Sequence, residues 1–205
     1  MNAVREVWQK PAIEKKPPAP LSLALQEMTA RLIGRGRDQP ARHLMLVGAA
    51  SGVGTTFVAG HWAALLSRVF PNVLLIECRA EASDLLPATS LPLVPAAPAT
   101  GQAVTRLRLP DSVCLATLTG AGTTAEWQQA FDLVLWDMPP VTASPAALLL
   151  ARHVDGIVLL AQANRTRRQV ALNSVQRLQE SGGNVLGVVL NRTLNFVPNW
   201  LYRLL

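Results

Sequence analysis

The chain has 205 residues, of which 50% are hydrophobic and 16% charged, and its mean hydropathy is +0.25. This composition excludes a mainly disordered protein, and the length allows one domain to bury a core without disulfides or a structural metal. The net charge of +6 belongs to the two ends: residues 1–43 carry +4, residues 44–151 carry −3 and residues 152–205 carry +5. All of the lysines lie within the first sixteen residues.

The two cysteines, Cys78 and Cys114, are too few for a disulfide scaffold. We expect them to be buried free thiols, as is usual in a reducing cytosol. The most apolar run, 143–163, is interrupted by proline and charged residues, so no segment is expected to span a membrane. The N-terminus lacks the apolar core and cleavage site of a signal peptide, and we expect a cytoplasmic protein.

The pattern of apolar residues divides the chain into a tail and one domain. Residues 1–20, rich in proline and lysine, predict a flexible tail, and residues 21–205 the folded domain. In chain order, the domain is expected to contain a helix over 21–33, a strand over 43–47, a helix over 56–70, a strand over 73–76, an irregular segment over 80–111, a candidate strand over 113–118, a short helix over 124–130, a strand over 133–136, a helix over 144–152, a strand over 156–161, a helix over 166–180 and a strand over 185–190. Apolar strands that alternate with helices indicate an α/β fold: a mostly parallel sheet with helices on both faces.

A glycine-rich loop, Gly48-Ala-Ala-Ser-Gly-Val-Gly-Thr-Thr56, follows the first strand and opens a helix. Glycines let consecutive backbone N–H groups turn inward around an anion, and a helix N-terminus favours negative charge. The loop resembles G-x-x-x-x-G-K-[ST] with one additional glycine, and a threonine stands at the lysine position. The alternative is a strand-to-helix turn that merely uses glycine. The predicted phosphate-binding residues are Gly48, Ser51, Gly52, Val53, Gly54, Thr55 and Thr56.

Two further segments follow apolar strands: Leu74-Leu-Ile-Glu-Cys-Arg79 and Asp132-Leu-Val-Leu-Trp-Asp-Met-Pro-Pro140. With the loop, they resemble the three nucleotide motifs of the bacterial tyrosine kinases of the capsule and exopolysaccharide type, a branch of the MinD/ParA group of P-loop ATPases. In that family the first motif is a Walker A loop, the second ends in Asp-x-Asp and the third in Asp-x-Pro-Pro. The resemblance continues through 154–160, 165–168 and 187–192, and it implies a single P-loop NTPase-like domain over 21–205.

The resemblance implies a role for several side chains. Thr56 would place its hydroxyl on Mg²⁺ and Asp137 would hold the water shell of the metal. The alternative for Asp137 is a capping or turn residue before Pro139. Glu77 would orient the attacking hydroxyl or water, and Asn191, with Arg192 beside it, would read the adenine edge. The implied cofactors are ATP or ADP with Mg²⁺.

Three departures from the family pattern bear on catalysis. Thr55 replaces the lysine that bridges the β- and γ-phosphates, Ala50 replaces the signature lysine of the MinD/ParA group, and Arg79 replaces the second Asp of Asp-x-Asp. Phosphoryl transfer depends on positioned cations, so we expect an inactive or weak enzyme. An arginine from elsewhere or from a neighbouring subunit is the open alternative, and Arg79 is the nearest candidate in sequence.

The remaining segments give weaker indications. The family's kinases phosphorylate a C-terminal tyrosine cluster, whereas Tyr202 is the only tyrosine here. The apolar positions of 197–205 predict either a short helix that closes the core or an amphipathic membrane contact. The histidines lack metal-ligand spacing, and the basic helix 165–177 lacks the aromatic residues of a nucleic-acid surface, so no nucleic-acid partner is expected.

The expected function is that of a degenerate P-loop, tyrosine-kinase-like protein that acts as a regulatory or scaffold component of bacterial exopolysaccharide or capsule biosynthesis and export. The resemblance implies a cytoplasmic location, peripheral at the inner membrane. It also implies docking on a polysaccharide chain-length regulator or another synthesis-complex subunit, in a homo- or hetero-oligomer. One alternative is an active tyrosine autokinase of the same pathway, and another is a MinD/ParA-like positioning ATPase on membrane or DNA.

Overall fold

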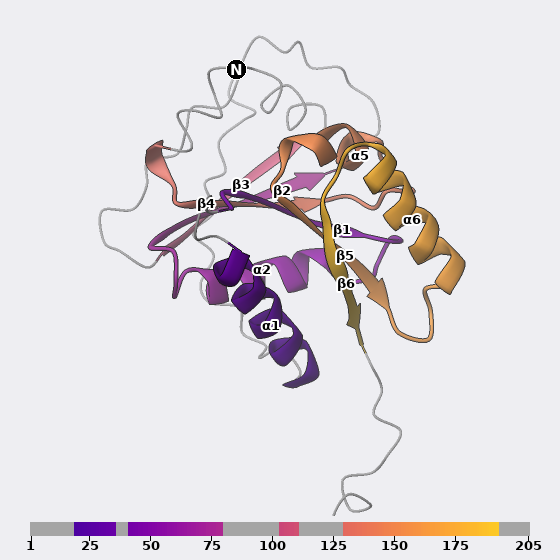
Figure 1. Cartoon of the computed structure of the whole chain (residues 1–205), viewed down its shortest axis with the longest axis horizontal. Helices are drawn as coiled ribbons and strands as arrows, with labels where there is room; N and C mark the ends of the chain where they lie inside the picture. Colours follow the sequence, from indigo (N-terminus) through magenta and orange to yellow (C-terminus); the bar gives the residue numbers. More distant parts are fainter. Residues whose placement is uncertain (1–18, 36–40, 80–102, 111–128, 193–205) are drawn as a thin grey trace, which may run out of the picture.

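The computed structural model describes residues 19–35, 41–79, 103–110 and 129–192 (Figure 1). The expected tail up to residue 18, the candidate strand 113–118 and the ending 197–205 lie outside these residues. Of the helix expected over 124–130, only Gln129 and Ala130 are described, and both are helical.

The centre of the molecule is a sheet to which the described residues contribute six strands. Its strands in chain order are β1 (His43–Gly48), β2 (Asn72–Arg79), β3 (Ala103–Pro110), β4 (Leu133–Met138), β5 (Gly156–Gln162) and β6 (Val185–Asn191). Their spatial order is β3-β2-β4-β1-β5-β6, and every neighbouring pair is parallel. The expected parallel sheet is therefore confirmed.

Helices cover both faces of this sheet, as the alternating pattern predicted. They are α1 (Ala19–Arg35), α2 (Thr55–Leu66), α5 (Ala146–Leu150), the 3₁₀ turn η1 (Ala151–His153) and α6 (Arg168–Glu180). Figure 1 shows α1 and α2 on one face and α5 and α6 on the other. None of the described helices is long and apolar enough to cross a membrane.

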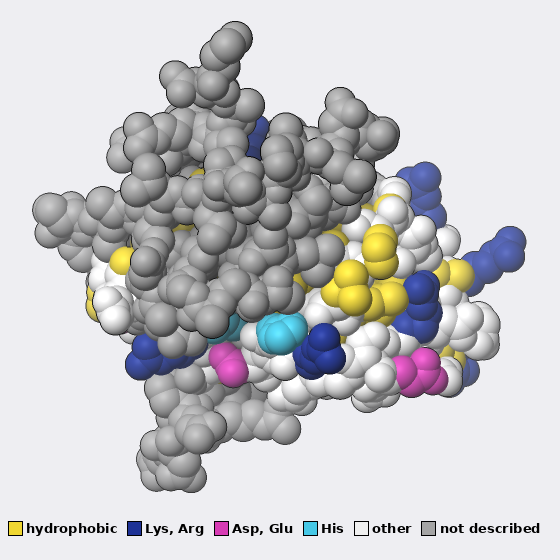
Figure 2. Space-filling view, turned by 90° about the horizontal axis from the view of Figure 1, so that it is seen from above, with side chains coloured by type: hydrophobic (Ala, Val, Ile, Leu, Met, Phe, Trp, Pro, Cys, Tyr) yellow, Lys and Arg dark blue, Asp and Glu magenta, His cyan; other side chains and the backbone are white. Residues whose placement is uncertain are grey.

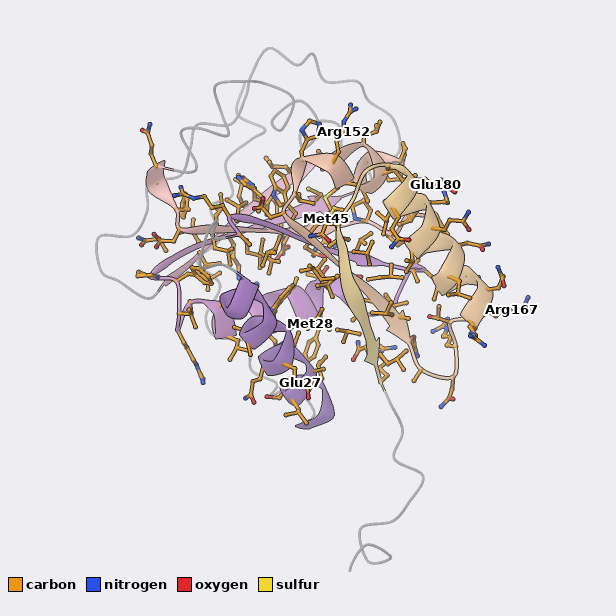
Figure 3. The ribbon with its side chains drawn as sticks, in the orientation of Figure 1. Glu27, Met28, Met45, Arg152, Arg167 and Glu180 are labelled. Atoms are coloured by element: carbon orange, nitrogen blue, oxygen red, sulfur yellow. The ribbon has the colours of Figure 1, made fainter. Side chains whose placement is uncertain are left out.

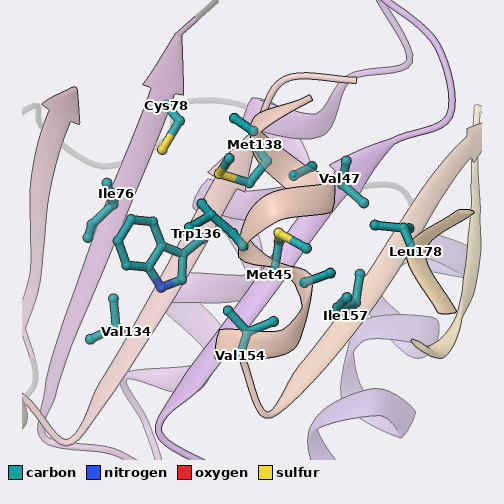
Figure 4. Packing of buried hydrophobic residues seen from close by; sticks show 14 of the residues in the cluster. Met45, Val47, Ile76, Cys78, Val134, Trp136, Met138, Val154, Ile157 and Leu178 are labelled. Atoms are coloured by element: carbon teal, nitrogen blue, oxygen red, sulfur yellow. The ribbon is translucent and has the colours of Figure 1, made fainter. Parts of the chain in front are cut away.

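The hydrophobic core has two layers, one on each face. Under α5 and α6, Met45 and Trp136 are fully buried, and Leu178 of α6 belongs to the same cluster, on the side of Ile157 (Figure 4). On the other face Trp62 of α2 is fully buried, and its indole N–H donates to the Thr29 hydroxyl of α1 at 3.1 Å. This bond fixes α1 on α2 without leaving the buried indole N–H unpaired.

The described surface around these layers mixes charged and hydrophobic side chains (Figure 2). In Figure 3, Arg152, Arg167 and Glu180 point outward while Met45 lies at the sheet in the interior of the molecule. The face with α5 and α6 carries basic, acidic and hydrophobic side chains together (Figure 2), and Leu149 and Leu172 are half exposed on those two helices.

The helix boundaries differ from the expected ones by a few residues, and three of the differences have a local reason. Helix α2 ends at Leu66 because the next residues form turns, with Val69 N donating to Leu66 O at 2.9 Å. Helix α6 begins at Arg168 because the Thr166 hydroxyl instead accepts from Gln162 N at 2.9 Å. Ser144 lies before α5 and accepts from an amide of its first turn, at 3.1 Å.

The expectation that 80–111 is wholly irregular is wrong, because its last eight residues form β3. In this strand Leu107 and Leu109 are buried, whereas Arg108 is exposed and Arg106 intermediate. Strict alternation is typical of a half-buried edge strand, and the prolines before it obscured that pattern.

The expectation of two free thiols is also wrong. Cys78 is disulfide-bonded in the structure. The sequence holds one other cysteine, Cys114, which is outside the described residues. The cysteines therefore do not support the argument for a reducing compartment.

Candidate phosphate-binding site

The loop between β1 and α2 has a backbone that requires glycine at three positions. Gly52 and Gly54 have φ angles of 75° and 91°, which L side chains rarely adopt. A Cβ at Gly48 would lie 2.9 Å from Thr55 Oγ1 and 3.1 Å from the Ala50 carbonyl oxygen. These glycines therefore let the loop fold back tightly over the end of β1.

Hydrogen bonds from distant elements hold this loop in place. Ala49 N donates to Leu160 O of β5 at 2.8 Å. The Asn191 side chain donates through Nδ2 to Val53 O, also at 2.8 Å. Gly54, at the N-cap of α2, provides no side-chain cap for the first turn. An uncapped helix start beside a fixed glycine loop offers backbone amides to an anion.

The loop lies at the topological switch point of the sheet, where the order in which the chain adds strands reverses. Strand β1 lies between β4 and β5, so the chain leaves it toward β2 on one side and later reaches β5 on the other. Ligands of open α/β sheets bind beyond the carboxyl ends of the strands at such a point. A pocket of about 420 Å³ is found there. It is lined by Ser51, Gly52, Gly54, Thr55, Thr56, Phe57, Cys78, Arg79, Asp137, Met138, Pro139 and Pro140.

Thr56 and Asp137 meet at the floor of this pocket. Asp137 is 3% exposed and accepts a hydrogen bond from the Thr56 hydroxyl. Burial raises the pKa of Asp137 to about 7, the Thr56 hydrogen bond and Arg79 oppose the rise, and the nearby Glu77 adds to it. A hydroxyl and a carboxylate side by side, next to a phosphate loop, match the protein groups that accompany Mg²⁺ in nucleotide sites. No cluster of three His, Cys, Asp or Glu residues suited to a metal occurs in the described part of the chain.

Beside this pair, Glu77 is surrounded by three arginines. The Glu77 side chain is 3% exposed. It pairs with Arg108 Nε at 2.9 Å, Arg79 Nη2 at 3.2 Å and Arg106 Nη1 at 3.6 Å. Of these three arginines, Arg79 lines the pocket. We refer to Glu77 with Arg79, Arg106 and Arg108 as the arginine cluster.

The sheet register explains why these groups meet. Arg108 of β3, Glu77 of β2 and Asp137 of β4 are direct neighbours across the three strands. Leu75 and Leu135, two residues before Glu77 and Asp137, belong to the core under α2. Since side chains alternate along a strand, both carboxylates continue that face, where α2 begins with the glycine loop.

The structure thus brings most of the predicted site residues together. The glycine loop, Thr55, Thr56 and Asp137 surround one pocket, while Val53 is buried behind it. Asn191 Oδ1 accepts from Arg192 N at 2.8 Å, so both ends of the Asn191 amide are engaged with backbone, and Arg192 has a positive φ of 55°. Reading of adenine by Asn191 and Arg192 stays a prediction.

Sequence reasoning missed Arg106 and Arg108. Both lie in the strand that was expected to be irregular. The signal that would have found them is the alternation of Arg106 and Arg108 with Leu107 and Leu109, which predicts two arginines on one face of a strand.

The six-stranded parallel sheet and the glycine loop at the start of α2 define a P-loop NTPase-like α/β domain. Solved structures agree with this class. The kinase domain of Escherichia coli tyrosine kinase ETK superposes with a TM-score of 0.67 at 20% identity, over 86% of this chain and 77% of that one. The MinD cell division protein of Aquifex aeolicus gives a TM-score of 0.55 at 16% identity, over 75% of this chain and 70% of that one.

Sequence relatives point to one branch of this class. The chain is 30% identical over 169 residues to the tyrosine-protein kinase Wzc of Salmonella typhi, which is 72% of this chain and 23% of the relative. It is 34% identical over 70 residues to the tyrosine-protein kinase CpsD of Streptococcus agalactiae, which is 34% of this chain and 31% of the relative. No family model matches the chain. The chain is thus a homologue of bacterial tyrosine kinases and spans a third or less of the length of these relatives.

Proposed function

We propose that the chain is a degenerate P-loop, tyrosine-kinase-like protein that regulates or scaffolds bacterial capsule or exopolysaccharide biosynthesis and export. One observation carries the proposal: the phosphate loop and the Thr56–Asp137 pair are kept, but the lysine position is Thr55. The chain has no lysine after residue 16, so no other element of the folded domain supplies one.

The ligand we propose is ATP or ADP. The glycine loop leaves backbone amides available to phosphate oxygens, and the close approach at Gly48 leaves no room for a side chain there. Thr56 and Asp137 are the residues that would hold Mg²⁺ with the nucleotide. When bound, the metal would neutralise phosphate charge, as it does in other P-loop proteins.

Inefficient phosphoryl transfer follows from two features of the pocket. Thr55 carries no charge to bridge the phosphates, and removal of one such contact costs orders of magnitude in rate. Both Glu77 oxygens face guanidinium groups rather than an open position for a substrate hydroxyl. A regulatory role requires binding only, which the backbone of the loop supports.

The partner we propose is an inner-membrane chain-length regulator or another subunit of the synthesis complex, with the chain peripheral at the cytoplasmic face. The support is the homology to bacterial tyrosine kinases and the charge of the two ends, +4 and +5, which favours an anionic surface. Helix α1 offers a docking face, since Leu23 is 58% exposed on it.

An active tyrosine autokinase is the second candidate, because one observation favours it. Arg79 lines the pocket and brings a positive charge to the site that lacks the lysine. In that case Arg79 would stabilise charge during transfer and not only during binding.

Calorimetry with ATP and ADP, followed by assays of hydrolysis and phosphotyrosine on the purified chain, tests the proposal. We expect binding without measurable turnover. Ser51→Glu, which adds a carboxylate at the pocket wall, should weaken binding, and Ser51→Ala is the matched control. Turnover that disappears in Asp137→Ala would contradict the degenerate assignment and support the autokinase.

Docking is tested separately in the native host. Leu23→Asp should reduce polymer production while leaving nucleotide affinity unchanged, because Leu23 is exposed on α1 and does not line the pocket. Leu172→Asp, at a similarly exposed position on α6, is the control. Equal loss in both variants would argue against a docking face on α1.

A further inference from the structure

Arg79 occupies a distinctive place in the molecule. It is the last residue of β2, its side chain is 50% exposed, and it lines the pocket together with Thr55, Thr56 and Asp137. Among the residues that line this pocket, it is the one with a positive charge. Its position at the end of β2, which β4 separates from β1, rather than in the loop, distinguishes it from the missing lysine.

The buried Glu77 carboxylate holds Arg79 in this position. Glu77 Oε2 accepts from Arg79 Nη2 at 3.2 Å and from Arg108 Nε at 2.9 Å. A guanidinium has five N–H donors, so one hydrogen bond to Glu77 leaves donors for a further anion. Glu77 thus acts here as an anchor for arginine, which differs from the orienting role that the family resemblance implies.

The three arginines contact one carboxylate but differ in their relation to the pocket. Arg106 and Arg108 contact Glu77 without lining the pocket, whereas Arg79 contacts Glu77 and lines the pocket. Among the arginines of the cluster, Arg79 is therefore the one that an anion held by the glycine loop would meet.

We propose that Arg79, anchored by Glu77, binds the terminal phosphate of a nucleoside di- or triphosphate in this pocket and that this binding does not require Mg²⁺. The inference deepens the proposed function and rests on its nucleotide site. A planar guanidinium matches phosphate oxygens in a two-pronged arrangement, which makes it an effective phosphate anchor. The guanidinium itself brings positive charge to the phosphate oxygens, so binding does not depend on a metal held by Thr56 and Asp137.

The test measures binding of ADP, ATP and inorganic pyrophosphate to the full chain, in Mg²⁺ and in EDTA. We expect the affinity for each ligand to agree between the two conditions within about threefold. Arg79→Gln should weaken binding roughly tenfold or more, the usual effect of losing a charge-assisted hydrogen bond. Arg79→Lys should retain part of the affinity, which also guards against misfolding of the Gln variant.

Two further variants sharpen the assignment. Arg106→Gln removes another partner of Glu77 without changing a pocket-lining residue, and it should keep the affinity within about threefold. Arg79→Asp returns the acidic residue of the family motif, and nucleotide binding should then become dependent on Mg²⁺.

The outcomes separate the inference from the proposed function. Binding that requires Mg²⁺ in the unchanged chain, or that Arg79→Gln leaves intact, overturns the role of Arg79 and leaves the nucleotide site standing. An equal loss in Arg106→Gln also overturns it, because the effect would then belong to the overall charge. If none of the three ligands binds, both the role of Arg79 and the proposed nucleotide site are overturned.

Discussion

The side-chain amide of Asn191 donates to the backbone carbonyl of Val53 at 2.8 Å, across 138 positions of sequence. Asn191 ends β6 and is 5% exposed, and Val53 belongs to the glycine loop after β1. The other end of the amide accepts from Arg192 N at 2.8 Å. One buried side chain thus connects β6 to the glycine loop.

Asn191→Ala should lower the free energy of unfolding by about 1–2 kcal/mol, because it leaves the Val53 carbonyl without this donor. It should also weaken nucleotide binding, since the loop loses one of its fixed points. Urea denaturation and calorimetry measure the two effects. Asn173→Ala, on the exposed side of α6, is the matched control and should change neither. A stable variant with unchanged affinity would show that the bond does not position the loop.

Gly54→Ala should destabilise the fold more than Gly52→Ala, although both glycines have a positive φ. Alanine at either position would adopt a strained left-handed conformation, which costs roughly 1–2 kcal/mol. At Gly54 the new Cβ would also lie 2.7 Å from Asn191 Nδ2, whereas nothing lies within 4 Å at Gly52. In the Asn191→Ala background the two substitutions should become similar in cost, which a double-mutant cycle measures. Equal costs in the unchanged chain would contradict this contact.

Much of this site follows from the sequence because its residues are neighbours in the chain. The spacing of Gly48, Gly52 and Gly54 predicts a turn that only glycine fits, and the structure has that turn. The arginine cluster follows from pairing instead. Arg108 meets Glu77 across 31 positions only because β3 pairs with β2, and no local pattern specifies that pairing.

The disulfide state of Cys78 could not be predicted for the same reason, because it depends on a contact between distant segments. Whether Cys78 is a thiol or half of a disulfide depends on which distant segment approaches β2. The number and spacing of the cysteines in the sequence do not reveal which segment that is. The overall order of strands and helices was predictable, since it rests on apolar periodicity within each segment.

Asp137→Asn should stabilise the ligand-free protein at alkaline pH. Burial raises the pKa of Asp137 from 3.8 to about 7, so the fold favours the protonated carboxyl. This contribution to stability is fully present below the unfolded pKa of 3.8 and is lost as the pH rises through about 7. From pH 5 to pH 8, the free energy of unfolding of Asp137→Asn should therefore rise by about 1–3 kcal/mol relative to that of the unchanged chain.

Urea denaturation at the two pH values measures this gain for Asp137→Asn. Glu180→Gln removes an exposed carboxylate at the end of α6 and controls for the change in net charge. A gain of the same size in Glu180→Gln would assign the effect to overall charge and not to the buried carboxyl.

Thr55→Lys tests whether the missing lysine alone accounts for the loss of catalysis that we propose. Thr55 lines the pocket, so a longer side chain at this position can extend into it. The single variant should bind ATP about tenfold more tightly, because it adds a charged contact to phosphate.

Thr55→Lys alone should not restore turnover, because Arg79 still stands where the family has a carboxylate. Only Thr55→Lys combined with Arg79→Asp should hydrolyse ATP, and only with Mg²⁺. Phosphate release with and without the metal measures this, and Arg79→Asp alone is the control. Turnover in the single Thr55→Lys variant would show that the lysine was the one missing part and that Arg79 does not obstruct catalysis.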